Sequence, residues 1–216
     1  MAMVARLGTI MRTDLLTLTQ WLSPAFPLGS FAYSHGLEQG IADGAVHDAQ
    51  SLQIWLTETL CFGAGHVDAV LLCQALQGAD MADTACALAA SKERWDESLA
   101  QGTAFAETLV TLGHQARPAA LPVAVGEAAR ALSLEPSEVA QLYLHAFASN
   151  LVSVAVRFVP LGQSEGQAVL AALHPIIAEI AETAPTTPLD RVGTAALMGD
   201  IAAMRHETLD VRLFRT

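Results

Sequence analysis

The chain has 216 residues, of which 52% are hydrophobic and 6% aromatic, and it carries a formal net charge of −11. A chain of this length suits one domain, and a core filled by Ala, Leu and Val favours packed helices over a β-sandwich. The acidic balance, with Lys92 as the single lysine, argues against a phosphate-binding surface and therefore against nucleic acid as a partner.

The first predicted helix begins near Asp14 and stops before a proline-rich segment at residues 23–38. That segment reads SPAFPLGSFAYSHGLE. Its prolines fix φ and its glycines tolerate unusual backbone angles, so it predicts a sharp turn of fixed shape. Ser34 is expected to cap the helix that follows, which places Phe31 and Tyr33 at a rigid entry to that helix.

The middle of the chain predicts a series of helices separated by glycines and prolines. They are expected at residues 48–62, 68–77, 81–91, 91–113 and 122–132. Asp48 is the expected N-cap of the first of these helices, and Ser91 or Lys92 begins the longest one.

Residues 137–159 carry the strongest helical pattern, because apolar side chains cover one face and most of the opposite face. This helix is expected to be the centre of the bundle or to lie in a subunit interface. The next helix, 163–182, contains Pro175, which predicts a kink or a split. A proline-containing linker then precedes a final helix at 190–204.

The sequence therefore predicts an all-α fold, a single-domain helical bundle of about eight to ten helices around a central apolar helix. The domain is expected to span residues 1–216, with a flexible N-terminus (1–13) and a partner-binding C-terminal tail (205–216). A charged fraction of 15% leaves an apolar surface, which indicates a protein that interacts with others.

Cysteine usage and hydropathy predict the cellular compartment in which the protein works. Cys61, Cys73 and Cys86 lie in apolar helical patterns without metal-type spacing, which is typical of reduced core thiols in the cytoplasm. The N-terminus has no apolar run of secretory length, and the longest apolar stretch, 151–159, is interrupted by a serine and an arginine. We expect neither a signal peptide nor a membrane span.

Motifs of conventional enzymes are absent from the sequence. A P-loop needs a lysine after a glycine-rich run, whereas Lys92 is followed by Glu93 with no glycine nearby. No Gly-x-Ser-x-Gly, His-Glu-x-x-His or Cys-x-x-Cys motif occurs either. The seven histidines are scattered, so neither an enzyme nor a closed metal site within the chain is expected.

Three segments stand out by their length and order. They are residues 23–38, quoted above, residues 159–167, which read VPLGQSEGQ, and the ending 205–216, which reads RHETLDVRLFRT. In this order they resemble the signatures of the urease accessory protein UreF family, and three long matches are far more specific than one short motif. His35 stands where the family more often has Gln, and Thr216 where Ser is expected; both departures keep a polar group.

The resemblance implies a non-catalytic nickel-insertion chaperone for the maturation of apo-urease. It implies a homodimer that bridges a UreD-type scaffold, also called UreH, and a UreG-type GTPase, and that gates GTP hydrolysis coupled to nickel delivery. No tightly bound cofactor is expected. Transient nickel contact stays open as an alternative: nickel would pass through a polar passage or bind at a subunit interface. His35 and His206 are the best candidate ligands.

Partner-binding residues are expected in the first and last segments. Three of the eleven cationic residues lie in the last twelve positions, and Arg beside Leu and Phe is typical of interface hot spots. The resemblance assigns this tail to the scaffold; a tail packed on its own domain is the alternative. The candidates are Phe31, Tyr33, His35, Glu38, Arg205, His206, Glu207, Arg212, Leu213, Phe214 and Arg215.

The sequence alone leaves other interpretations open. Residues 159–167 are either simple turn chemistry or a partner contact. A helical-bundle metal-binding enzyme would gather His and Glu in its core, although its Glu-x-x-His motif is missing. A helical adaptor unrelated to urease is the remaining alternative.

Overall fold

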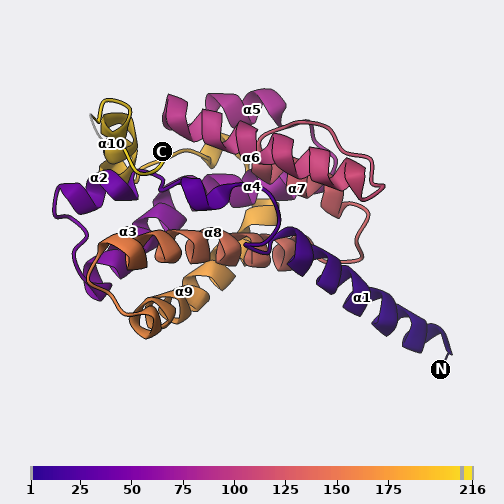
Figure 1. Cartoon of the computed structure of the whole chain (residues 1–216). Coiled ribbons are helices and arrows are strands. Elements are labelled where there is room, and N and C mark those ends of the chain that lie inside the picture. The colour runs from indigo at the N-terminus through magenta and orange to yellow at the C-terminus, as the bar shows by residue number, and fades with distance from the viewer. Residues whose placement is uncertain (1, 210–211, 216) are drawn as a thin grey trace.

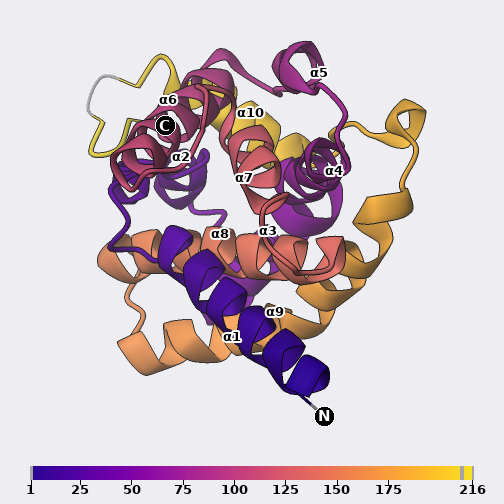
Figure 2. The same cartoon turned by 90° about the vertical axis from the view of Figure 1, so that its right-hand side faces the viewer.

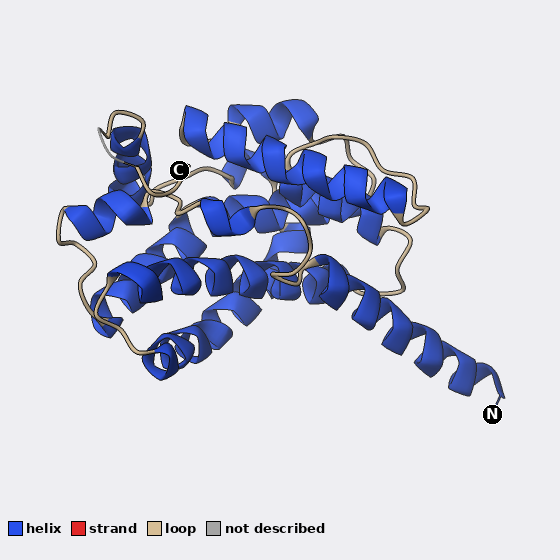
Figure 3. Ribbon diagram, viewed as in Figure 1, coloured by secondary structure: helices blue, strands red, loops and turns tan. Residues whose placement is uncertain are grey.

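The computed structural model describes residues 2–209 and 212–215, with side chains from residue 12 onward. Helices and their connecting loops make up this part of the chain, and no strand occurs within it (Figure 3). The predicted all-α, single-domain fold is confirmed.

The α-helices range in length from 6 residues in α2 and α5 to 23 residues in α8. The α-helices are α1 (Ala2–Trp21), α2 (Leu37–Ala42), α3 (Ala49–Phe62), α4 (Ala64–Leu76), α5 (Ala82–Ala87), α6 (Lys92–Thr111), α7 (Leu121–Ala129), α8 (Pro136–Phe158), α9 (Gln163–Thr183) and α10 (Leu197–His206). The 3-10 turns are η1 (Ser30–Ala32), η2 (Ala184–Thr186) and η3 (Leu189–Arg191).

Helix α8 lies at the centre of the bundle, as its apolar surface predicts. It crosses the middle of the molecule in two views, with α9 on one side and α4, α6 and α7 on the other (Figures 1 and 2). Leu144 and Leu151 of α8 are buried together with Leu173 of α9 and Leu56 of α3 in one connected core. Burial of these apolar faces is the main source of the bundle's stability.

Capping residues explain where several helices begin. Asp48 accepts the N–H of Ser51 at 2.8 Å, and the Ser51 hydroxyl accepts the N–H of Asp48 at 3.0 Å, which confirms the predicted cap of α3. Ser91 accepts the N–H of Arg94 at 3.1 Å and starts α6. Pro136 begins α8, where its missing N–H costs nothing.

Three predicted starts were wrong. The first helix begins at Ala2 rather than near Asp14, and whether residues 1–13 are flexible stays a prediction. Gly63 ends α3, but α4 starts directly after it rather than at residue 68, because one non-helical residue (φ −122°, ψ −145°) is enough to redirect the chain. The last helix begins at Leu197 rather than at residue 190, since residues 192–196 are non-helical.

Pro175 does not split α9, which runs without a break from Gln163 to Thr183. Its ring faces outward, because Pro175 is exposed while Leu173 and Ile177 are buried. Packing of the apolar face against α8 and α3 therefore outweighs the hydrogen bond that the proline removes.

Three helical stretches are long and apolar enough to cross a membrane by length and composition: Ala49–Leu76, Pro136–Phe158 and Gln163–Thr186. The expectation of no membrane span rested on the longest apolar stretch, residues 151–159, which is too short a segment to detect these three helical stretches. In the fold, 67%, 50% and 39% of their most apolar windows are buried, so packing within the bundle uses much of this apolar surface. The absence of a membrane partner stays a prediction.

Candidate partner-binding site

The segment 29–36 turns twice through left-handed backbone. Gly29 (φ 70°) precedes η1, and His35 (φ 53°) and Gly36 (φ 73°) precede α2. A Cβ on Gly36 would lie 2.6 Å from the backbone nitrogen of Ala203 in α10, so only glycine permits this approach. The predicted turn is confirmed, and α10 packs directly against it. The Ser34 hydroxyl accepts the N–H of Glu38 at 3.3 Å inside the first turn of α2, although Gly36 occupies the N-cap position itself.

Helix α8 holds this turn from the other side. The side-chain amide of Asn150 donates to the carbonyl of Ser30 at 3.0 Å and to that of Tyr33 at 3.4 Å. Tyr33 is buried, whereas Phe31 is 64% exposed. The turn therefore directs one aromatic ring into the core and leaves the other exposed.

Glu38, in the first turn of α2, fastens the C-terminal tail to the turn. Its carboxylate accepts the backbone N–H of Leu213 at 2.9 Å and that of Phe214 at 3.0 Å. Next to this contact, the N–H of Arg215 donates to the carbonyl of Ala32 at 2.7 Å. The first and last segments of the sequence pattern are therefore in direct contact.

His206 joins Glu38 to Glu93 of α6. Its ring is fully buried, with Nε2 3.0 Å from Glu38 and Nδ1 2.9 Å from Glu93. Arg212 donates to the second oxygen of Glu93 at 2.9 Å. An ionised carboxylate only accepts hydrogen bonds, so Glu38 and Glu93 are suited to accept from the donors that face them. Two carboxylates therefore alternate with a histidine ring and a guanidinium in this cluster.

Hydrogen bonds decide the charge of Glu38. Burial acts to raise its pKa, but the N–H groups of Leu213 and Phe214 and the ring of His206 outweigh burial, so the pKa lies below its ordinary value. The ionised carboxylate is thus the form that holds the tail.

Phe214 ties the tail to the end of α8. Its buried ring meets Phe158 edge-on, with ring centroids 5.2 Å apart. Phe158 directly precedes the segment 159–167, in which Glu165 accepts the N–H of Gly162 at 2.8 Å and caps α9. The tail thus contacts the residue that precedes the second segment, and the second segment provides turn and cap chemistry at the start of α9.

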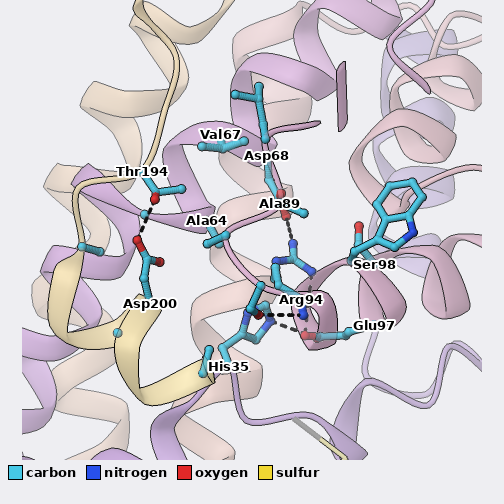
Figure 4. A pocket seen from close by; sticks show the side chains of 18 of the residues that line it. His35, Ala64, Val67, Asp68, Ala89, Arg94, Glu97, Ser98, Thr194 and Asp200 are labelled. Carbon is cyan, nitrogen blue, oxygen red and sulfur yellow. Dashed lines mark hydrogen bonds and ion pairs between the residues drawn. The ribbon is translucent and has the colours of Figure 1, made fainter. Parts of the chain in front are cut away.

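Behind the turn, a buried polar cluster lines a small cavity of about 60 Å³ (Figure 4). His35 lies 3.0 Å from Glu97, and Arg94 donates to Asp68 at 2.6 Å. The Tyr143 hydroxyl also donates to Asp68, at 2.7 Å. The cluster therefore connects the turn to α4, α6 and α8.

The charges of this cluster are mutually satisfied. Burial disfavours a charged Arg94, but Asp68 and Glu97 hold its pKa above its ordinary value. Burial, with Asp68 beside it, raises the pKa of Tyr143 well above its ordinary value. Among the described residues, no buried side-chain nitrogen or oxygen lacks a hydrogen-bond partner. Such a closed network suits a role in holding the turn in place.

The structure divides the predicted site residues into two groups. The residues that are buried or half-buried are Tyr33, His35, Glu38, His206 and Phe214. The residues that are exposed are Phe31, Arg205, Glu207, Arg212, Leu213 and Arg215. The first group positions the turn and the tail, and the second is accessible to a partner.

Sequence reasoning missed the residues that hold the site together, above all Glu93, Glu97 and Asn150. The one available signal was the spacing of Glu93 and Glu97, one helical turn apart after the Ser91 cap. Glutamates at this spacing usually face solvent, so the pattern alone did not mark them as buried partners of distant histidines.

A metal centre has little geometric support at this site. Within the described part of the chain, no group of three or more His, Cys, Asp or Glu side chains is placed to hold a metal ion. His35 and His206, the predicted nickel candidates, each contact carboxylates. No observation favours the alternative of an enzyme with a metal in the bundle core.

Comparisons with known proteins agree on one family. A family model described as UreF matches residues 46–174. A Cereibacter sphaeroides protein named urease accessory protein UreF is 59% identical over 210 residues, which cover 95% of this chain and 100% of that protein. Proteins of the same name from Dinoroseobacter shibae and Ruegeria pomeroyi are 50% and 43% identical, covering 93% and 97% of this chain and 98% and 100% of their own length. The resemblance seen in the sequence is confirmed, and an unrelated adaptor no longer fits.

Proposed function

The chain belongs to the UreF family of urease accessory proteins, and we propose that it assists the maturation of apo-urease as a non-catalytic assembly protein. In this proposal it works in the cytoplasm as a homodimer that bridges a UreD/UreH-type scaffold and a UreG-type GTPase. It gates GTP hydrolysis by the second partner and couples that hydrolysis to nickel delivery, with no tightly bound cofactor of its own.

The scaffold contact rests on one observation, the meeting of the turn 29–36 and the tail 212–215. Phe31 and Leu213 are large apolar side chains that are 64% and 67% exposed. They extend from backbone that is held by hydrogen bonds to Asn150 and Glu38. We name the surface made by Phe31, Leu213 and Arg215 the turn–tail face.

Fixed backbone favours binding at this face. Exposed apolar side chains on a preorganised backbone lose less conformational entropy on association than side chains on a mobile loop. Aromatic and arginine side chains are also the residues that most often dominate interface energies. The turn–tail face therefore has the composition and the rigidity of an interface centre.

An open polar groove lies beside the turn–tail face. It has a volume of about 460 Å³, and its lining includes Lys92, Asp96, Glu207 and Arg215. Charges of both signs alternate there, which suits the polar rim that surrounds apolar anchors in protein interfaces. The acidic remainder of the chain, with its net charge of −11, favours a basic surface on the GTPase.

Co-purification tests the proposal. The full-length chain is coexpressed with UreD-type and UreG-type partners and recovered as a ternary complex. A Phe31→Ala, Leu213→Ala double variant is expected to weaken scaffold binding at least tenfold, because both apolar anchors are truncated. Arg215→Ala is expected to weaken it less, since this residue lies at the polar edge of the face.

Leu112→Ala is the matched control. Leu112 is 50% exposed and follows the C-terminal end of α6, about 30 Å along that helix from Lys92. If the wild type binds neither partner, the assembly function is wrong. If the wild type and the double variant bind the scaffold equally, the contact lies elsewhere and only the turn–tail assignment fails.

A further inference from the structure

Helices α8 and α9 bring two histidines together away from the turn–tail face. His145 of α8 and His174 of α9 have ring centroids 5.5 Å apart, with 44° between their planes. His174 is exposed and His145 is half-buried. Within the described chain, no other two histidine rings contact each other.

The pair opens into a surface hollow. Its volume is about 420 Å³, and its other lining residues are Leu15, Glu138, Gln141, Leu142 and Ile177. A water molecule occupies about 30 Å³, so the hollow can hold an ion together with several waters. No residue of the turn–tail face contributes to it.

Neither ring is engaged by the rest of the protein. Among the described residues, no hydrogen bond or ion pair joins the ring nitrogens of His145 or His174 to another group. His35 and His206, by contrast, contact carboxylates, and His47 contacts a backbone carbonyl. The nitrogens of this pair are therefore available to a ligand from solution.

The separation of the rings fits two imidazoles on one ion. With metal–nitrogen bonds of about 2.1 Å, ring centroids lie about 5.2 Å apart at a tetrahedral angle and about 4.5 Å apart at 90°. The observed 5.5 Å is close to the tetrahedral value.

We propose that His145 and His174 form a two-histidine site for a borderline divalent cation such as Ni²⁺ or Zn²⁺, with the remaining coordination positions open to water or to a ligand from a partner. Borderline ions accept imidazole nitrogen, and a cross-helix pair chelates better than either ring alone. The site lies apart from the turn–tail face and does not depend on the proposed assembly function.

Glu138 also lines the hollow, but its carboxylate accepts the N–H of Glu135 at 2.9 Å at the start of α8, two helical turns from His145. The proposed site therefore rests on the two rings alone.

Calorimetric titration of Ni²⁺ and Zn²⁺ into the full-length chain without an affinity tag tests the site. His145→Ala and His174→Ala are each expected to weaken binding at least tenfold, because the chelate is lost. His47→Ala, at an exposed histidine between α2 and α3, is expected to change the affinity less than twofold.

Two controls keep the result interpretable. His174 is exposed, so its variant is expected to fold normally, and the unfolding midpoint without metal checks this. Anomalous diffraction at the nickel edge is expected to place the ion between the two rings. Equal affinities in the wild type and both pair variants, or no binding by the wild type, would overturn the site and leave the assembly function untouched.

Discussion

At the residue scale, the site depends on carboxylates that each satisfy several donors. Glu38 accepts two backbone N–H groups of the tail and one nitrogen of His206, and Glu93 accepts the other nitrogen and Arg212. Removing one member of such a cluster leaves its buried partners unpaired, which costs more than the lost bond alone.

His206→Ala is expected to lower the free energy of unfolding by about 2 to 4 kcal/mol, because two largely buried carboxylates would face each other across a void. Urea unfolding measures this loss. His47→Ala, at an exposed histidine, is the control and should change stability by less than about 0.5 kcal/mol. A loss below about 1 kcal/mol for His206→Ala would show that the cluster does not hold the tail.

Acid is expected to release the tail only below the ordinary range of glutamate. The pKa of Glu38 is lower in the folded than in the unfolded chain, so its stabilisation is complete above the unfolded value and is lost as pH falls through the folded one. NMR shifts of the Leu213 and Phe214 amides should titrate below pH of about 4.3, and Glu38→Gln should abolish this titration. A midpoint at or above that pH would contradict the assignment.

At the element scale, helix existence was easier to predict than helix ends. Asp48 and Ser91 marked the starts of α3 and α6 correctly, because side-chain capping is a local interaction. The helix after Gly63 was expected to begin only at residue 68, yet α4 follows Gly63 at once. The deciding factor is the packing of α4 against its neighbours, which local sequence does not contain.

Pro175→Ala is expected to raise the free energy of unfolding by about 1 to 3 kcal/mol, since an exposed position inside α9 regains a helical hydrogen bond. Chemical denaturation checks the gain. Pro118→Ala is the matched control. This exposed proline lies in the loop before α7, so its replacement regains no helical hydrogen bond. A loss of stability in Pro175→Ala would mean that the proline shapes α9 for packing.

At the scale of the whole molecule, close approach of backbones fixes how the layers stack. A Cβ on Gly102 of α6 would lie 1.9 Å from the carbonyl oxygen of Ala119, just before α7. A Cβ on Gly126 of α7 would lie 2.4 Å from the carbonyl oxygen of Leu72 in α4. These glycines allow α4, α7 and α6 to pack without side chains between their backbones.

Gly102→Ala is therefore expected to destabilise the fold by about 3 kcal/mol, despite the better helix propensity of alanine. Gly193→Ala is the control, since a Cβ there meets no atom within 4 Å and the backbone is not left-handed. Thermal and urea unfolding of both variants give the comparison. Equal stabilities would show that the contact between α6 and the segment before α7 is looser than described.

The site shows most clearly what local sequence cannot predict. Glu93 and His206 are 113 residues apart, and Glu38 and Phe214 are 176 apart, yet each pair is hydrogen-bonded. The sequence predicted a turn with Phe31 and a tail with three arginines, but the contacts between them depend on the folded bundle. The resemblance supplied the association of both segments with partners, and the geometry separates their anchoring residues from their exposed ones.

Differential hydrogen exchange, with and without a UreD-type scaffold, tests the central claim most directly. Scaffold binding is expected to slow exchange at residues 29–36 and 212–215 and to leave exchange in α8 and α9 around His145 unchanged. Protection confined to α1, α9 or the end of α6, with unchanged exchange at the turn and the tail, would contradict it.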